Sequence, residues 1–397
     1  MRFCGIVSEY NPFHNGHALH IALSREKTGA DYIICVMSGS FVQRGEPAIF
    51  DKWTRAACAL LCGADAVIEL PLLYAVQSAE GFASGGVAVL EAAGAKAISF
   101  GCETDDIEAL SDAAERLNDE TGDYKRALKE HLQSGLSFPK ARMKAAYPET
   151  PDEFCMPNAI LAIEYMRAVK NSSCNITPYA IQRVGEGYHS EDIGASLASA
   201  TAIRKAFKQG HGESALSAMP EACAEYISKR LEEGLIPVMP SRFDRELMFG
   251  LRRGGREYIK TLPDVSEGLE NRIYDAASQC YTREELIASI KTKRYTYTRI
   301  SRILLYALLG ITKDMVEKQN TKSVEYIRVL GARSKDVLSA LSSVSRVPVI
   351  AGSVASTAYE DIDIKASDVY ALSQSVKPFS NVARDYTEKL IIADELD

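Results

Sequence analysis

The first hundred residues alternate between short apolar runs and longer stretches in which apolar residues recur at helical spacing. The apolar runs predict strands at residues 3–7, 32–37, 65–70 and 97–101. The stretches between them predict helices at residues 16–27, 51–62 and 77–93. Because strands that are apolar throughout are buried on both faces, this alternation predicts a parallel sheet with helices on both sides.

The pattern changes twice further along the chain. Residues 105–169 have helical periodicity and predict an insertion, after which residues 177–184 predict a fifth strand. Beyond about residue 240 helical periodicity dominates, with one further strand predicted at 346–352. We therefore expect an α/β fold, in which a Rossmann-like parallel-sheet domain over residues 1–240 is followed by a mainly helical domain over residues 241–397.

The composition is that of an ordinary globular protein. The 397 residues are 46% hydrophobic and 25% charged, and the net charge of -7 argues against indiscriminate nucleic-acid binding without excluding a local basic surface. No signal-like segment opens the chain, and polar residues interrupt every long apolar run, so we expect a cytoplasmic protein without membrane contact. The nine cysteines are scattered, and the close pair Cys58 and Cys62 is expected to pack in a helix.

Three of the six histidines lie at the turn after the first predicted strand. In 9-EYNPFHNGHALH-20, His14, His17 and His20 recur every three residues, and no HExxH or paired CxxC motif occurs in the chain. Helical zinc sites place their ligands four residues apart. We therefore expect no metal ligation by these histidines.

The same turn fits a phosphate site. Asn11 or Asn15 is the expected cap of the following helix, whose first backbone amides would attract an anion. Gly16 permits a ligand to approach the backbone closely, and imidazoles at this position would bind phosphoryl oxygens as charge develops.

A second helix start with polar character lies downstream, at 199-SATAIRKAF-207. Ser199 and Thr201 are candidate N-caps, and Arg204 has the fork geometry to hold phosphates near the same amides. The alternative is a capped surface helix with a solvated arginine. Together with 14-HNGH-17, this segment resembles the HxGH nucleotidyltransferase superfamily, whose members form a bond at the alpha phosphate of ATP and release pyrophosphate.

Three longer stretches narrow the resemblance. The segments 5-GIVSEYNPFHNGH-17, 38-SGSFVQRGEPA-48 and 181-IQRVGEGYH-189 resemble the bacterial tRNA(Met) cytidine acetate ligase family, and the likeness continues to 292–310 and beyond. The resemblance implies that ATP, with Mg2+, activates acetate as acetyl-adenylate. It also implies that the acetyl group is then transferred to N4 of the wobble cytidine of elongator tRNA(Met), giving N4-acetylcytidine.

The resemblance further implies which residues form the site. His14, His17 and Arg204 are the expected catalytic residues. The expected ATP contacts are Val7, Ser8, Glu9, Asn11, Phe13, His14, Gly16, His17, His20, Gly101, Asn158, Arg183, Ser199 and Thr201. In the loop after the second strand, Arg44 and Lys52 are candidates for the carboxylate of acetate or the alpha phosphate. The alternative there is a surface loop in which Asp51 caps a helix.

A basic and aromatic segment in the helical region predicts contact with RNA. The candidate residues carry no acidic residue between them and are Lys291, Lys293, Arg294, Tyr295, Tyr297, Arg299 and Arg302. Cations would neutralise phosphates, and aromatic rings would stack on unpaired bases. The alternative is an ordinary solvated helix start.

Two other functions are compatible with this sequence. An adenylyltransferase acting on a small phosphorylated metabolite would share the ATP site, but it would need neither the basic segment nor a long helical domain. A non-catalytic RNA-binding protein on the same scaffold would share the helical domain. The intact HNGH and SATAIR motifs speak against this second alternative.

Overall fold

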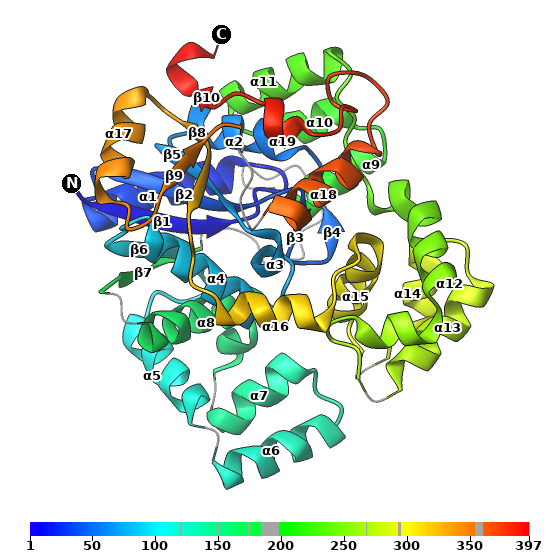
Figure 1. The fold of residues 1–397 in the computed structure, drawn as a ribbon. Coiled ribbons are helices and arrows are strands. Elements are labelled where there is room, and N and C mark those ends of the chain that lie inside the picture. Colours follow the sequence, from blue (N-terminus) through cyan, green and yellow to red (C-terminus); the bar gives the residue numbers. More distant parts are fainter. Residues whose placement is uncertain are drawn as a thin grey trace.

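In the computed structural model, a central sheet is flanked by helices and extended by two helical units (Figure 1). The structure describes residues 1–119, 121–149, 151–172, 175–183, 198–266, 268–292, 295–353 and 360–396. Within these residues no helix is both long enough and apolar enough to span a membrane.

Five parallel strands form the core of the sheet, and they confirm the five strands predicted in the first half of the chain. They are β1 (Phe3–Ser8), β2 (Tyr32–Ser38), β5 (Ala66–Leu70), β6 (Ala97–Cys102) and β7 (Thr177–Gln182). Their order is β7-β6-β1-β2-β5, and each neighbouring pair is parallel. Strand order therefore reverses between β1 and β6, and ligands of open parallel sheets bind beyond the carboxyl ends of the strands at such a point.

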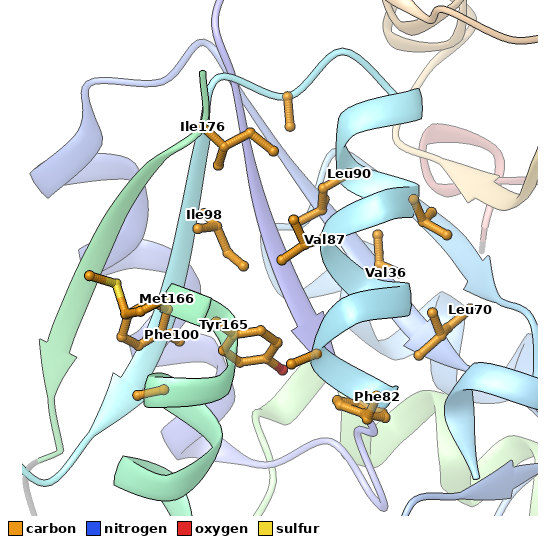
Figure 2. Packing of buried hydrophobic residues seen from close by; sticks show 14 of the residues in the cluster. Val36, Leu70, Phe82, Val87, Leu90, Ile98, Phe100, Tyr165, Met166 and Ile176 are labelled. Atoms are coloured by element: carbon orange, nitrogen blue, oxygen red, sulfur yellow. The ribbon is translucent and has the colours of Figure 1, made fainter. Parts of the chain in front are cut away.

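Helices cover both faces of this sheet, as the apolar strands predict. On one face α4 packs over β1, β2 and β5, and α8 packs over β6, where the rings of Phe100 and Tyr165 stack with centroids 5.7 Å apart (Figure 2). The other face is covered by α1, α2 and α11, with Cys58 in the core and Cys62 packed against it. The covering helices are α1 (Asn15–Thr28), α2 (Lys52–Leu61), α4 (Ala79–Ala92), α8 (Pro157–Asn171) and α11 (Glu221–Glu232).

The described chain between β6 and β7 is helical. Its elements are α5 (Ile107–Asn118), α6 (Gly122–Gln133), α7 (Phe138–Ala146), η1 (Asp152–Cys155) and the covering helix α8. The shorter elements around the sheet are β3 (Phe41–Val42), β4 (Glu46–Pro47), α3 (Leu72–Ala75), α9 (Ala200–Lys208) and α10 (Gly212–Leu216). The antiparallel pair β3 and β4 forms a small hairpin after β2.

From residue 240 to residue 321 the described chain is helical, and it packs in a core around Leu251, Ile273 and Leu304 that Phe41 and Leu72 also join. It lies beside the sheet, at the right of Figure 1. Its elements are η2 (Pro240–Phe243), α12 (Asp244–Thr261), α13 (Leu269–Gln279), α14 (Arg283–Ile290), α15 (Tyr297–Leu309) and α16 (Lys313–Thr321).

The structure corrects the expected extent of this second domain, 241–397, because the chain returns to the sheet after α16. β8 (Ile327–Ala332) pairs antiparallel with β5, while β9 (Val349–Ala351) and β10 (Ile391–Ile392) pair parallel with β8. The strand expected at 346–352 therefore exists, but it belongs to the main sheet. The other elements of this return are α17 (Lys335–Val344), α18 (Glu360–Ala371), α19 (Arg384–Thr387) and η3 (Ala393–Glu395).

Candidate active site

The HNGH motif forms the start of α1, directly beyond the carboxyl end of β1. His14 is the N-cap, so the expectation that Asn11 or Asn15 caps this helix is wrong. The Nδ1 atom of His14 accepts a hydrogen bond from the Gly16 N–H at 3.1 Å, and His17 Nδ1 accepts one from the His14 N–H at 3.3 Å. The two imidazoles thus form a reciprocal capping box and order the helix start themselves.

These hydrogen bonds also decide where the imidazoles carry their protons. Because Nδ1 accepts in both rings, the proton of each neutral imidazole lies on Nε2, which is then a donor. The ring centroids of His14 and His17 are 3.7 Å apart. Burial, with the positive charges of Arg183 and Arg204, lowers the pKa of His14 to about 3. Burial and the neighbouring His14 hold the pKa of His17 well below its usual range. Both residues are therefore neutral Nε2–H donors at neutral pH.

His20 lies one turn further along the same helix. Its Nε2 is 3.3 Å from Ser99 Oγ on β6, and Ser99 in turn contacts Ser24 Oγ at 2.7 Å. Burial, helped by the charge of Arg183, lowers the pKa of His20 to about 4. In this structure His20 thus bridges α1 and β6.

The helix α9 confirms the predicted capping and brings an arginine to the HNGH turn. Ser199 is its N-cap and accepts from the Ala202 N–H at 3.2 Å. The Nη1 of Arg204 donates to the carbonyl oxygen of Asn11 at 2.7 Å, and its Nη2 donates to Thr201 Oγ1 at 3.3 Å. The two signatures, far apart in sequence, therefore meet at one edge of the sheet.

A second cation lies near Arg204. Burial lowers the pKa of Arg204, the nearby Glu46 carboxylate opposes this shift, and the positive charge of Arg44 makes a smaller lowering contribution. Arginine nevertheless stays protonated in proteins, so Arg204 keeps its positive charge beside the Asn11 carbonyl, and Arg44 adds a second positive charge in its surroundings. This half-buried pair is suited to an anionic ligand.

The ends of β1 and β6 supply further candidate residues. Ser8 Oγ, at the end of β1, is buried without a hydrogen-bond partner among the described residues. Gly101, at the end of β6, lies against Arg183, since a Cβ at Gly101 would be 3.5 Å from Arg183 Cγ. Asn158, at the start of α8, donates from Nδ2 to Glu103 at 2.8 Å. These groups lie along the switch point, where a ligand of the sheet is expected.

Other predicted ATP contacts have clear structural roles. Glu9 Oε1 accepts from the Gln43 N–H at 2.9 Å, and Asn11 Oδ1 accepts from the Ile49 N–H at 2.7 Å. These two bonds hold the loop after β2 against the HNGH turn. Phe13 is only 1% exposed and belongs to the core, and Val7 packs on α4, since a Cβ at Gly86 would be 2.8 Å from it.

Arg55 fixes the loops of the site, a role that the sequence pattern did not reveal. Arg55 is 1% exposed and donates to the carbonyl oxygens of Glu9 at 2.6 Å, Ser38 at 3.0 Å and Phe50 at 2.9 Å. It also donates to Gly39 O. The only signal in the sequence is a lone arginine in the apolar run 54-TRAACALL-61.

Lys52, a candidate ligand for acetate or the alpha phosphate, is instead buried in an ion network. Its Nζ is 2.7 Å from Glu69 Oε1 and 2.5 Å from Asp385 Oδ1, and the side chain has no exposed surface. Arg328 pairs with the same two carboxylates. Burial alone would raise the pKa of Asp385, but Lys52 and Arg328 lower it to about 2. Lys52 is therefore part of a buried ion network and offers no surface to acetate, whereas the expected cap Asp51 does accept from the Thr54 N–H at 2.9 Å.

The basic and aromatic segment is mostly packed into the helical domain. Tyr295 is 6% exposed and lies beneath the guanidinium of Arg299, 5.4 Å from the ring centroid. Arg299 donates to the Asp264 carbonyl at 2.7 Å, and Arg302 pairs with the Asp264 carboxylate at 3.1 Å. Tyr295 is thus not accessible for stacking on a base.

The rest of that segment gives a mixed picture. Tyr297 is half-buried, with its hydroxyl 3.4 Å from Glu46 Oε1, while Lys291 is exposed. Lys293 and Arg294 lie outside the residues that the structure describes. The segment's surface available to RNA is accordingly smaller than the sequence pattern predicts.

The hairpin of β3 and β4 joins the helical domain to the site. Gly45 accepts at its carbonyl from Ser301 Oγ at 2.9 Å. Its φ of +78° and its position, where a Cβ would be 2.4 Å from the Arg302 nitrogen, leave room only for glycine. Because Gln43 in the same hairpin bonds to Glu9, the helical domain contacts the site through one short loop.

Neutral imidazole donors at a helix start and an arginine beside them, at the switch point of a parallel sheet, are the arrangement typical of nucleotidyltransferases. Residues 1–385 match the family HIGH Nucleotidyl Transferase. The chain is 38% identical to the tRNA(Met) cytidine acetate ligase of Acetivibrio thermocellus, over 99% of this chain and 100% of that one. It is 40% identical to the enzyme of the same name from Caldanaerobacter subterraneus subsp. tengcongensis, over 94% and 96% of the two chains.

Solved structures agree with this likeness. The crystal structure of Thermotoga maritima TmcAL bound with alpha-thio ATP is 34% identical and superposes with a TM-score of 0.88, covering 99% of this chain and 100% of that one. The apo structure of the same protein gives a TM-score of 0.90 at 33% identity, with the same coverage. This chain belongs to the HIGH nucleotidyl transferases and, among them, to the tRNA(Met) cytidine acetate ligase family.

Proposed function

We propose that this chain is a two-step ligase that activates acetate with ATP and then acetylates N4 of the wobble cytidine of elongator tRNA(Met). The observation that carries the proposal is the meeting of the HNGH turn and Arg204 at the switch point of the sheet. The full-length relatives that bear the ligase name, and the structure bound with an ATP analogue, support it.

In the first step an acetate oxygen attacks the alpha phosphorus of ATP, and the bond from that phosphorus to the leaving pyrophosphate breaks. The Nε2–H groups of His14 and His17 and the first amides of α1 donate to the phosphate oxygens as charge develops on them. Since both imidazoles are neutral, they can lie side by side before ATP binds without mutual repulsion. Arg204 and Arg44 provide positive charge for the phosphates and the acetate carboxylate.

Mg2+ belongs to this proposal as the ion that accompanies ATP. Among the described residues, no group of three or more His, Cys, Asp or Glu side chains could hold a metal ion. An Mg2+ ion that accompanies ATP takes most of its ligands from phosphate oxygens and water rather than from a protein cage. When bound, Mg2+ neutralises part of the triphosphate charge.

In the second step the N4 amine of cytidine attacks the acyl carbon of acetyl-adenylate. The bond from that carbon to the phosphate oxygen breaks, AMP leaves, and the amine loses one proton. Holding the adenylate and the base in contact supplies much of the rate of such an acyl transfer. Discrimination against propionate depends on about 1 to 3 kcal/mol for one extra methylene.

Incubation of the protein with ATP, labelled acetate and tRNA from a strain that lacks N4-acetylcytidine tests the proposal. Label recovered as N4-acetylcytidine at the wobble position of elongator tRNA(Met) is the expected result. Label confined to a small-molecule product would favour an adenylyltransferase of small metabolites. Binding of tRNA with no release of pyrophosphate would favour a non-catalytic RNA-binding protein.

A further inference from the structure

An exposed groove in the helical domain combines aromatic rings with arginines. It has a volume of about 590 Å³, and its lining residues are Arg245, Met248, Phe249, Arg252, Arg253 and Tyr281. Phe249 is 64% exposed and Tyr281 is 75% exposed, although both are large apolar side chains. Exposed aromatic surface gathered in one place is typical of an interaction site.

The groove follows one side of α12. Arg245, Phe249, Arg252 and Arg253 recur at spacings of four, three and one residues, which places them on a common helix face. Leu251, on the opposite side, is fully buried against the rest of the helical domain. The other face of α12 is therefore buried in the helical domain. The face formed by these four residues, together with Tyr281, is here called the α12 face, and no other described residue covers it.

The rings of the α12 face are held by cations. The guanidinium carbon of Arg252 lies 5.4 Å from the ring centroid of Tyr281, and that of Arg253 lies 5.8 Å from the ring centroid of Phe249. Arg252 also donates to the carbonyl oxygens of Ala277 at 2.9 Å and Cys280 at 2.7 Å. These bonds fix Arg252 beneath Tyr281 and hold the ring in a defined position.

The charge of the α12 face is one-sided. Three arginines and no carboxylate line the groove, in a chain whose net charge is -7. Arg245 and Arg253 form no ion pair with any described residue. The Glu285 carboxylate accepts from the Tyr281 N–H at 2.8 Å but pairs with neither of these arginines. Guanidinium groups outside any ion pair, next to exposed rings, match a ligand that presents phosphates together with flat apolar faces.

We propose that the α12 face binds unpaired nucleotides of the tRNA substrate, with Phe249 and Tyr281 stacking on bases and Arg245 and Arg253 contacting phosphates. This inference rests on the proposed function, because it takes tRNA as the substrate. Single-stranded RNA is recognised by this combination of aromatic stacking and basic charge. Much of the segment 291–302, the candidate from the sequence, is packed in the core or paired with Asp264.

The position of the α12 face also suits a substrate that must reach the ATP site. α12 packs against α15, and α15 packs against β4 of the hairpin that bonds to Glu9. The helical domain is thus attached directly beside the HNGH turn, so a nucleic acid lying along it can extend to the acyl-adenylate.

Binding of tRNA to the full-length protein, measured by fluorescence anisotropy at several salt concentrations, tests this assignment. Phe249→Ala or Tyr281→Ala is expected to weaken binding by about 5- to 100-fold, since one base then has no ring to stack on. Arg245→Gln with Arg253→Gln is expected to reduce the slope of log affinity against log salt by about 0.7 to 0.9 for each arginine that meets a phosphate. Acetate-dependent exchange of pyrophosphate into ATP should stay at the wild-type rate in all of them.

Matched controls lie elsewhere on the surface. Phe138→Ala removes a ring that is 53% exposed on the insertion, and Arg346→Gln removes an exposed arginine that pairs with Glu91. Neither control should change tRNA affinity by more than about twofold, because residues outside the centre of an interface contribute little to binding.

The outcomes separate this inference from the function on which it rests. If the wild-type protein acetylates tRNA and the four substitutions leave tRNA affinity and salt slope unchanged, the α12 face is not the RNA surface although the ligase function stands. If the substitutions instead convert a dimer to a monomer in light scattering without affecting tRNA affinity, the face binds a second copy, and the inference is overturned. A wild-type protein that neither binds nor acetylates tRNA would refute both the function and the RNA surface.

Discussion

The guanidinium of Arg204 donates a hydrogen bond of 2.7 Å to the carbonyl oxygen of Asn11, a residue 193 positions earlier in the chain. This bond fixes the arginine of α9 beside the helix start that His14 caps. A cation and a set of aligned amides are thus in place before any ligand arrives, which lowers the cost of reorganisation when charge develops on a phosphate.

Replacement of Arg204 tests its phosphate role. Arg204→Ala should lower kcat/KM for acetate-dependent adenylate formation by about a hundredfold or more, the usual cost of removing one donor to a developing charge. Arg204→Lys should recover only part of this loss, because lysine is a point charge without the bidentate fork. Lys208→Ala, at the exposed end of the same helix, is the matched control. Full recovery by lysine in pyrophosphate-exchange assays would refute the fork argument.

The histidines of the HNGH turn can be tested for two separate roles. His14→Ala removes both a phosphate donor and the N-cap, so it should abolish pyrophosphate exchange and cost about 0.5 to 2 kcal/mol of stability. His14→Asn keeps a good cap and should recover the stability but not the activity. Exchange kinetics and urea unfolding measure the two effects, and tRNA affinity should stay unchanged in both variants. Loss of tRNA binding would mean that the turn contacts tRNA rather than ATP.

Acidification should destabilise the ligand-free protein. The pKa values of His14 and His20 in the folded chain, about 3 and about 4, lie below the ordinary value of 6.5. Between the folded-state and unfolded-state pKa values the unfolded chain binds more protons than the folded chain. The free energy of unfolding is therefore highest above pH 6.5 and decreases as the pH falls below that value. Each histidine should cost about 2 kcal/mol between about pH 7.5 and pH 5. Urea unfolding should show a smaller acid loss in His20→Gln, and equal losses in both proteins would contradict the burial argument.

Lys52 should prove structural. Lys52→Met leaves Glu69 and Asp385 with Arg328 as their remaining cation, and loss of one partner from a buried pair costs up to about 3 to 5 kcal/mol. Lys335→Met breaks an exposed pair with Glu395 and should cost less than about 1 kcal/mol. Thermal unfolding gives the stability, and steady-state kinetics give KM for acetate, which should stay near wild type in folded Lys52→Met. A large rise in that KM with little loss of stability would restore Lys52 as an acetate ligand.

Gly45 should be intolerant of any side chain. Gly45→Ala combines a positive φ with a Cβ that would meet the Arg302 backbone. Gly29 also has a positive φ, of +59°, but a Cβ there would have no other atom within 4 Å. Gly29→Ala therefore measures the cost of the backbone conformation alone, about 1 to 2 kcal/mol. Gly45→Ala should lose clearly more stability than this control in urea unfolding. Equal losses of stability in the two variants would show that the hairpin can move to accommodate the methyl group without disturbing the helical domain.

Sequence patterns identified the features that depend on local order. The five parallel strands are continuous apolar runs, and the HNGH and SATAIR segments each carry their own helix-start chemistry, so both could be predicted. Features that depend on distant partners could not be predicted. Asp385 meets Lys52 from 333 positions away, and a lysine in the first turn of a helix gives no sign of such a partner.

Short strands and buried side chains account for the other differences between the sequence-based predictions and the structure. β3, β4 and β10 contain only two residues each, too few for a period to be recognised. Tyr295 sits in a segment rich in cations and therefore resembles an RNA contact, but its ring packs in the helical core. The exposed rings Phe249 and Tyr281 belong to segments 32 residues apart in sequence, so only the fold brings them to one groove.

The return of the chain to the sheet has a consequence for its synthesis on the ribosome. β8 and β10 close one edge of a sheet whose other strands are made much earlier, and Asp385 supplies one of the two carboxylates that balance Lys52 and Arg328. A product that terminates before this residue leaves the buried cations Lys52 and Arg328 without one of the two carboxylates with which they form ion pairs. Premature termination therefore yields a protein with a damaged core rather than a working ATP site, and such a product is exposed to proteolytic clearance.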